Sequence, residues 1–375
     1  MFMRAVAAVG IAACASGGAR AAAAAEAGPA PHELEPEEPQ DLTQLSAAVR
    51  AQEDASAAPK ADLTTLSLDE LMDLKVTTAS RKPERWWSAP NGIDVVTGDD
   101  IRRAGVQNLP DAIRLAAGVQ VGQPSARSWA ISIRGMDVLA ANKISVVMDG
   151  RSLFTPFFSG VQWDAKDTLV EAIDRIEVVR GPVGALWGAF AVNGLIQILT
   201  KAAWDTQGLL VSAGRGTEDP GFFGLRYGGK LGKETYFRTY AKYFQTDWTY
   251  LASGEHAQPA TDFFQSGFRV DGRRSHDTVV TLQGDYYTNQ NLPLDRLQTE
   301  ISGANLLGRW RRAFSADSEL QVEGYFDHTY WLIPESFEER RSTGSASVKY
   351  RLTAGRNGLL FGADASRREP RSCWA

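Results

Sequence analysis

The stretch VVRGPVGALWGAFAVNGLIQILTK, residues 178–201, constrains the fold of this chain more than any other. An apolar, β-prone run ends at Arg180-Gly181-Pro182, where glycine allows a tight turn and proline cannot donate to a sheet ladder. Glycines at 184, 188 and 194 allow further tight turns, and Leu195 to Leu199 resumes a strand. These residues predict a strand, a glycine-rich turn and a second strand in a compact α+β unit.

The residues before this stretch predict further short elements. Thr97 is a suitable N-cap for a helix from Asp99 to Ala104, and a second helix near 110–116 begins with a proline and ends at Gly118. The predicted strands are Ile93–Val96, Ile131–Met136, Ile144–Arg151 with a turn at Asp149-Gly150, and Ile173–Pro182.

From Asn91 to Lys201 these motifs, taken in order, resemble the plug domain of TonB-dependent outer-membrane receptors. The resemblance implies a mainly β fold, in which an α+β plug at residues 82–201 lies inside an antiparallel transmembrane β-barrel. It also implies a protein of the Gram-negative outer membrane.

After Lys201 apolar and polar residues alternate. Between residues 319 and 330, one face carries Leu320, Val322, Gly324, Phe326, His328 and Tyr330, and the other carries Glu319, Gln321, Glu323, Tyr325, Asp327 and Thr329. The same division recurs at 278–287, 304–311 and 346–352. A soluble sandwich also alternates, but strands of about ten residues with aromatic ends favour a barrel with lipid outside and water inside.

The predicted connections between these strands alternate in length. Short ones fall near 229–233, 272–276, 315–317 and 354–357, and longer ones near 214–221, 246–261, 289–302 and 331–342. Outer-membrane barrels have short periplasmic turns and longer outer loops. The pattern therefore favours such a barrel, with its first strand rising from the periplasm.

The strand count falls short of a closed barrel. About nine strands are predicted in 202–368, whereas plugged outer-membrane transporters close with about 22. Residues 369–375 break the alternation and resemble the tail of a frameshift product or an incomplete gene model. We therefore expect a barrel that is incomplete in this chain. An open sheet of this kind has unpaired edges and is not stable in lipid.

The N-terminus carries a predicted signal peptide, residues 1–25, with Arg4 before an apolar run and small residues at its end. Lipid attachment at Cys14 is the alternative. Residues 26–74 predict a flexible linker that ends in a short amphipathic helix, Leu66–Leu74.

A short β-prone segment, 75–81, precedes the plug. In TonB-dependent receptors a segment of this Val-Thr character is the TonB box, which pairs by strand addition with the energy-transducing TonB complex. An ordinary strand leading into the plug is the alternative. The residues that the resemblance assigns to TonB contact are Lys75, Val76, Thr77, Thr78, Ala79 and Ser80.

Arg134 and Arg180 each stand at a strand end beside a glycine. In the family, arginines at such motifs form ion pairs with barrel glutamates that hold the plug in place. The resemblance therefore implies a seating role for both, with glutamate partners in strands that this sequence lacks. Solvated arginines that line a wet interface are the alternative.

The composition and motifs argue against a nucleic-acid-binding protein, a disulfide-rich protein and an enzyme. The net charge of −5 gives no basic footprint for nucleic acid, and two cysteines exclude a disulfide framework. No nucleophile elbow or phosphate loop occurs. We expect no enzyme activity, no cofactor and no metal site, because ligand spacing is absent among the four histidines, His32, His256, His276 and His328.

The resemblance implies TonB-dependent active uptake of a scarce large solute, typically a ferric siderophore, with cobalamin or another organic compound as alternatives. The expected partners are the TonB complex, outer-membrane lipid and a small-molecule ligand, and the expected state is a monomer. Two other readings stay open. One is a passive pore or surface adhesin, and the other is a truncated, non-transporting remnant or plug-only periplasmic binding fragment.

Overall fold

The computed structural model describes residues 75–76, 84–85, 89 and 91–374, except 125–127, 136–142, 157–159, 189, 217–220, 248, 251–253, 255, 259, 276, 292–298, 316 and 355–356. The chain divides into two compact units, Met1–Thr65 and Leu66–Ala375, and only the second contains described residues. The predicted signal peptide and linker, 1–74, lie outside the described residues, as do residues 77–81 of the predicted TonB box.

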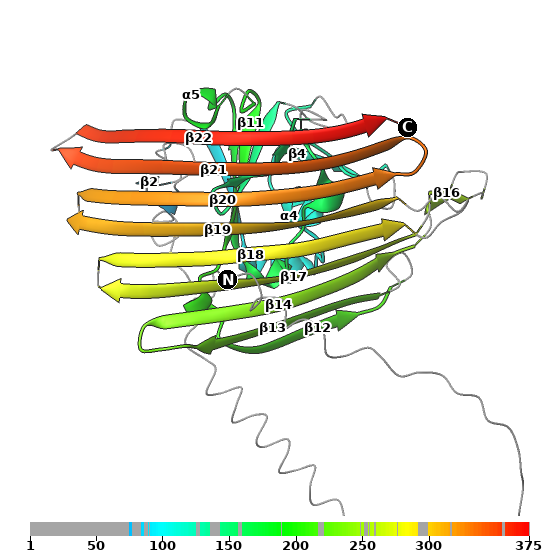
Figure 1. Ribbon diagram of the computed structural model, residues 1–375, viewed down its shortest axis with the longest axis horizontal. Coiled ribbons are helices and arrows are strands. Elements are labelled where there is room, and N and C mark those ends of the chain that lie inside the picture. Colours follow the sequence, from blue (N-terminus) through cyan, green and yellow to red (C-terminus); the bar gives the residue numbers. More distant parts are fainter. Residues whose placement is uncertain are drawn as a thin grey trace, which may run out of the picture. The chain divides into compact units, whose positions relative to one another are not determined.

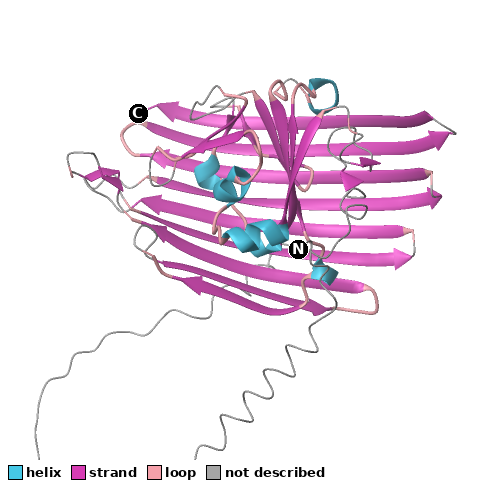
Figure 2. Ribbon diagram, turned by 180° about the vertical axis from the view of Figure 1, so that it is seen from behind, coloured by secondary structure: helices cyan, strands magenta, loops and turns pink. Residues whose placement is uncertain are grey.

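Five strands form a small mixed sheet in the order β3-β10-β11-β6-β7 (Figures 1 and 2). All neighbours are antiparallel except β11 and β6, which are parallel. The predicted strand, turn and strand of residues 178–201 are confirmed, because β10 and β11 pair from Arg180 opposite Gly194 onward. The bounds are β3 (Gly92–Thr97), β6 (Ile144–Met148), β7 (Arg151–Ser152), β10 (Ile173–Arg180) and β11 (Gly194–Thr200). We call residues 92–200 the five-stranded body.

Shorter elements accompany this sheet. They are the pairs β1 (Lys75–Val76) with β2 (Glu84–Arg85), β4 (Val119–Gly122) with β5 (Ala130–Ile133), and β8 (Phe154–Thr155) with β9 (Gly160–Val161). The 3-10 helices are η2 (Trp163–Ala165), η3 (Val170–Ala172) and η4 (Ala203–Asp205), and α5 (Gly184–Trp187) lies between β10 and β11.

Both helices predicted within the plug are confirmed. Helix α3 (Gly98–Ala104) begins with a capping box, in which the Asp100 amide donates to Thr97 Oγ1 at 3.2 Å and the Thr97 amide donates to Asp100 Oδ2 at 2.9 Å. Helix α4 (Leu109–Arg114) has Asn108 as its N-cap and a proline in its first turn. None of the helices among the described residues is long and apolar enough to cross a membrane.

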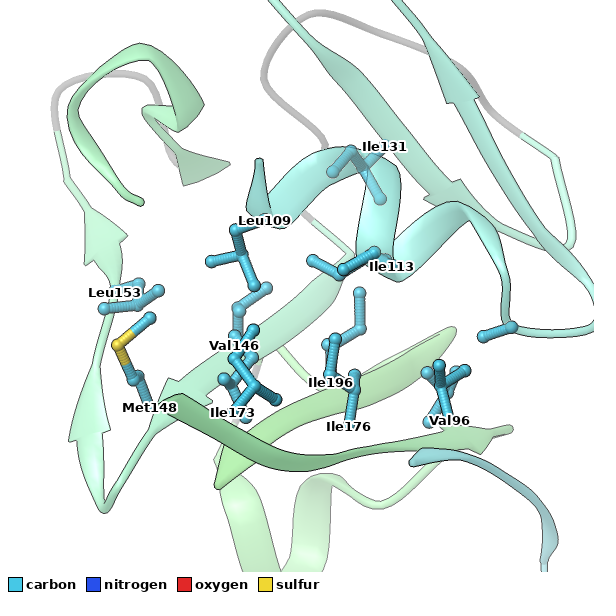
Figure 3. Packing of buried hydrophobic residues seen from close by; sticks show 14 of the residues in the cluster. Val96, Leu109, Ile113, Ile131, Val146, Met148, Leu153, Ile173, Ile176 and Ile196 are labelled. Carbon is cyan, nitrogen blue, oxygen red and sulfur yellow. The ribbon is translucent and has the colours of Figure 1, made fainter. Parts of the chain in front are cut away.

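The core of the five-stranded body lies between its sheet and α4 (Figure 3). Leu109 and Ile113 of α4 pack with Val146, Ile176 and Ile196 of the sheet, and all five are 0% exposed. Burial of such side chains stabilises a fold by about 1.5–3 kcal/mol each. This core therefore holds α4 against the sheet.

Nine long strands form a second, entirely antiparallel sheet, β12 through β22 without β15 and β16 (Figure 1). Its edges are β12 and β22, so the sheet is open among the described strands, and the predicted count of nine is confirmed. A small hairpin, β15 (Thr249–Tyr250) and β16 (His256–Gln258), lies between β14 and β17. The bounds are β12 (Gly208–Gly214), β13 (Gly221–Lys230), β14 (Thr235–Thr246), β17 (Thr261–Ser275), β18 (Thr278–Asn291), β19 (Glu300–Ser315), β20 (Ser318–Ile333), β21 (Phe337–Ala354) and β22 (Asn357–Trp374).

The two faces of the nine-stranded sheet differ as the alternation predicts. On β20, Val322 and Phe326 are 39% and 51% exposed, whereas Glu323 and Asp327 are 4% and 8% exposed. The polar, inner face is the one that contacts the five-stranded body (Figure 2). A soluble sandwich buries its apolar faces against each other, so this inverted arrangement fits strands that face lipid.

The connections confirm most of the predicted alternation, with one correction. The predicted long connection at 331–342 is wrong, because β20 and β21 pair up to Ile333 opposite Phe337 and leave only 334–336 between them. The charges of 338–341 alternate between the two faces of the sheet. Glu339 and Arg341 form an inner ion pair at 3.0 Å, and Glu338 and Arg340 form an outer one at 2.8 Å.

The end of the sequence also differs from the expected tail. Residues 369–374 continue β22, with Pro370 opposite Arg341 and Trp374 opposite Phe337. Proline cannot donate to a ladder and is tolerated on edge strands. Pro370 is compatible with β22 because β22 is an edge of the described sheet.

The assignment of the faces predicts opposite effects at two adjacent residues of β20. We expect Phe326→Lys to lower the free energy of unfolding in lipid vesicles by about 2–4 kcal/mol, because it places a charge on the lipid face. Tyr325→Lys is the matched control, since Tyr325 lines a polar space on the inner face and should cost much less. Denaturant titration of vesicle-inserted protein measures both, and equal losses would reject the assignment.

Candidate functional site

The candidate site is the interface between the five-stranded body and the inner face of the nine-stranded sheet. Charged residues of both partners are buried there. Because an unpaired buried charge is strongly unfavourable, the pairing of these charges determines where the body lies against the sheet.

The first contact is the turn between β6 and β7. Asp149 and Gly150 have φ values of 47° and 92°, as an Asp-Gly turn of type I′ requires. The Asp149 carboxylate accepts hydrogen bonds from the Thr200 amide at 2.9 Å and from Gln283 Nε2 at 3.0 Å, and Arg269 Nη1 lies 3.8 Å away. Arg309 of β19 donates to the Asp149 carbonyl.

These partners set the charge state of Asp149. Burial by itself would raise the pKa of this carboxyl, but the Arg269 charge and the hydrogen bonds from Thr200 outweigh burial and hold the pKa below its ordinary value. Asp149 is therefore a buried carboxylate that stays ionised between the two sheets.

The second contact joins Asp167 to Lys242 of β14. Each side chain is 5% exposed. The Lys242 ammonium donates to Asp167 Oδ2 at 2.5 Å, to the Gln107 carbonyl at 2.7 Å and to the Thr168 carbonyl at 3.0 Å. Asp167 Oδ1 accepts from the Leu109 amide at 3.0 Å, at the start of α4. All three donors of this lysine are used, so the pair is fully compensated.

The third contact joins β7 to β20. Arg151 forms a buried ion pair with Asp327, and Lys166 lies 3.7 Å from the same carboxylate. Nearby, Arg341 of β21 donates to Thr155 Oγ1 of β8. The five-stranded body is thus connected to β14, β17, β18, β19, β20 and β21 by charged or polar side chains.

The two predicted seating residues lie together at another place. The Arg134 guanidinium donates to the Arg180 carbonyl at 3.4 Å, and Arg134 itself has a φ of 62°. The Arg180 side chain packs closely against Gly118. A Cβ atom in place of the glycine hydrogen would lie only 3.1 Å from Arg180 Cδ. Neither guanidinium forms an ion pair with a carboxylate of the described residues, so their seating role stays a prediction.

Of the predicted TonB box, the described part is Lys75 and Val76. They form β1 and pair with Arg85 and Glu84 of β2. Contact with TonB stays a prediction for the whole segment, Lys75 to Ser80.

The sequence analysis missed the residues that make the observed ion pairs. Asp149 was identified only as part of a turn, and Asp327 only as a member of a polar face. One feature of the sequence could have indicated them. Charged residues at inward positions of alternating strands, such as Lys242 and Arg269, require oppositely charged partners inside the barrel. The sequence did not say which charges of residues 149–168 they meet.

A pocket lies between the five-stranded body and one end of the nine-stranded sheet, the end at which the longer connections join the strands. We call this the long-connection end. The pocket has a volume of about 700 Å³, including the space at its open mouth. Aromatic side chains form much of its wall: Trp129 and Trp163 of the body with Phe222, Phe244 and Phe263 of the sheet. Amide and carboxylate groups complete it, at Gln107, Asn108, Asp111, Gln123, Asp164, Asp167 and Asn289.

A larger polar space of about 1800 Å³ lies between the five-stranded body and strands β17 to β22. The Asp149–Gly150 turn borders it, together with Arg175 of β10 and charged residues of β19 and β20. Fold and interface together define a class of protein: a plug held by buried charges against the polar face of a sheet whose outer face is apolar.

Parts of this chain are similar in sequence to known proteins. Residues 87–195 match the family described as TonB-dependent Receptor Plug Domain. The vitamin B12 transporter BtuB of Vibrio cholerae serotype O1 is 33% identical over 146 residues, which cover 38% of this chain and 23% of that protein. BtuB of Vibrio vulnificus is 28% identical over 148 residues, 39% of this chain and 23% of that protein.

Solved structures agree in fold. The pyoverdine receptor FpvA of Pseudomonas aeruginosa PAO1 aligns with a TM-score of 0.63 at 18% identity, over 80% of this chain and 50% of that one. The siderophore receptor PirA of Pseudomonas aeruginosa aligns with a TM-score of 0.59 at 22% identity, over 76% and 49%. Residues 87–195 therefore form a plug domain of the kind found in TonB-dependent receptors, and the chain shares the fold of outer-membrane receptors such as FpvA. The chain spans about half the length of these solved structures, and its match covers 23% of the curated relatives.

The Asp149 site predicts a pH-dependent loss of stability. We expect Asp149→Asn to lower the free energy of unfolding by about 1–3 kcal/mol at pH 7, because the buried hydrogen bonds from Thr200 and Gln283 lose their charged acceptor, while Arg269 keeps its closer partner Asp271. Since the folded pKa lies below the unfolded value of about 3.9, the stabilisation is complete above that value and disappears as the pH falls through the folded pKa. Denaturant titrations at pH 7 and pH 3 measure this.

Asp277→Asn in the exposed β17–β18 turn is the control for this variant, and it should unfold like the wild type at both pH values. A deficit of Asp149→Asn that persists undiminished at pH 3 would show that the ionised carboxylate is not what stabilises the turn.

The Arg151–Asp327 pair predicts strong coupling. We expect Arg151→Gln and Asp327→Asn each to cost about 3–5 kcal/mol, and the double variant to cost about 1–3 kcal/mol less than their sum. The exposed Arg340–Glu338 pair on the outer face is the control, with coupling below about 1 kcal/mol. A double-mutant cycle by denaturant titration measures both, and equal coupling in the two pairs is the result that contradicts burial as the cause.

Proposed function

We propose that this protein acts in TonB-dependent active uptake of a scarce large solute across the outer membrane. The observation that supports the proposal most is the plug held by buried ion pairs against the polar inner face of the sheet. A plug of this kind blocks free diffusion, and the polar space beside it is a path for a solute once the plug moves.

Energy for such a step comes from outside the chain. We propose that Lys75 to Ser80 pair with TonB by strand addition, and that pulling on this segment loosens the plug. Its place directly before the plug supports the assignment. The energy source is the proton gradient across the inner membrane, transmitted by the partner.

The ligand is proposed to bind in the aromatic and amide-lined pocket at the long-connection end. Concave sites with aromatic walls and a few polar groups are typical of small-molecule binding. A ferric siderophore is the first candidate, in keeping with the fold of siderophore receptors such as PirA. Cobalamin is the second, because the matched curated relatives are vitamin B12 transporters.

For Arg134 and Arg180 we propose a seating role that adds to the observed ion pairs. The hydrogen bond from the Arg134 guanidinium to the Arg180 carbonyl joins the end of β5 to the end of β10, so both residues lie at the same end of the plug. Arg180 Nε is buried without a hydrogen-bond partner among the described residues, as expected for a group that pairs with a further carboxylate.

A deletion tests the proposal. We expect removal of residues 75–80 to abolish energised uptake of labelled ferric siderophores or cyanocobalamin, while ligand binding to intact cells persists, because the segment transmits force and does not form the pocket. Uptake assays in cells producing either form of the protein measure this, with a deletion of linker residues 55–60 as a length-matched control.

Each failure has its own meaning. Uptake that survives the deletion indicates a passive pore, whereas surface attachment without uptake indicates an adhesin. Absence of the protein from the outer-membrane fraction indicates a non-transporting remnant.

A further inference from the structure

A second lysine at the plug interface is bonded very differently from Lys242. Lys166 follows η2, and its side chain is 5% exposed. Its ammonium donates to the Tyr287 hydroxyl at 3.4 Å, which is long for a hydrogen bond. Its other polar neighbour, Asp327 Oδ2, lies 3.7 Å away. Lys242, at the same interface, makes three hydrogen bonds of 2.5 to 3.0 Å.

The carboxylates near Lys166 are bonded mainly to other cations. Asp327 forms its short contact with Arg151, and Glu339 pairs with Arg341 at 3.0 Å. Among the described residues, the carboxylate nearest to Lys166 is therefore that of Asp327, which lies 3.7 Å away and is also paired with Arg151. A buried ammonium without a close counter-charge is unfavourable unless an anion reaches it.

A cavity lies at this point. Its volume is about 290 Å³, including the space at its open mouth, and it is bordered by Lys166, Arg341 and Arg368. Arg368, on the edge strand β22, forms no ion pair with a described residue and lies over the Phe154 ring, 5.6 Å from its centroid. The hydroxyl residues Ser152 and Thr343 also line the cavity, and Asp327 is the carboxylate in its wall.

We propose that this cavity binds an oxyanion, a phosphate or carboxylate group, between Lys166, Arg341 and Arg368. Guanidinium and ammonium groups recognise such oxygens through charge-assisted hydrogen bonds. The hydroxyl groups of the wall donate further hydrogen bonds, and an anion here adds a second counter-charge to the one that Lys166 shares with Arg151 at Asp327. The cavity is smaller than the aromatic pocket and is lined by other residues, so it is a distinct site.

Calorimetric titration of the purified full-length protein in detergent tests the proposal, with inorganic phosphate and acetate as separate probes at matched ionic strength. We expect saturable binding of at least one probe, and we expect Lys166→Gln to weaken it about tenfold or more, as loss of a charge-assisted hydrogen bond predicts. Lys166→Arg keeps the charge and should retain binding. The two probes distinguish a site for free phosphate from one for carboxylate groups.

Arg340→Gln is the matched control for Arg341→Gln, because the two arginines are adjacent on β21 and lie on opposite faces. Only Arg341→Gln should weaken binding. Failure of the wild type to bind either probe, or unchanged binding by Lys166→Gln, overturns the proposal and leaves a lysine whose counter-charge comes from elsewhere in the chain. The titration needs neither TonB nor a transported ligand, so its result is independent of the uptake assay.

Discussion

The pairing of buried charges across the plug interface is the constraint on which this structure depends. An inner face that carries Lys242, Arg269 and Asp327 cannot be buried against apolar residues without a large desolvation cost. The plug meets that constraint with carboxylates and cations of its own, at Asp149 and Arg151 among others. Position and charge state are therefore set together, because moving the plug away exposes or unpairs these groups.

The same alternation along the strands produces both environments that the protein needs. Successive residues of a strand point to opposite faces, so one sequence pattern gives an apolar outer face and a polar inner face. On β20 the neighbours Phe326 and Asp327 belong to different environments. The polar space beside the plug and the aromatic pocket at the long-connection end both follow from the residues that face inward.

Local sequence patterns predicted much of the fold, and they failed where contacts between distant residues determined the local structure. The capping box at Thr97 and the Asp149-Gly150 turn were predictable because each depends on residues a few positions apart. The loop predicted at 331–342 was wrong because residues 337–342 pair with β20 on one side and β22 on the other, and the local pattern does not show these partners. Arg341 lies in the strand because Thr155 and Glu339 receive its hydrogen bonds.

By itself the sequence determined the types of most elements and the division of the strands into two faces, since these depend on short-range periodicity and turn chemistry. Tertiary structure alone decided which charges pair. Asp167 and Lys242 are 75 residues apart, and Arg151 and Asp327 are 176 apart. No local pattern encodes such distances, because they depend on where the plug lies against the sheet.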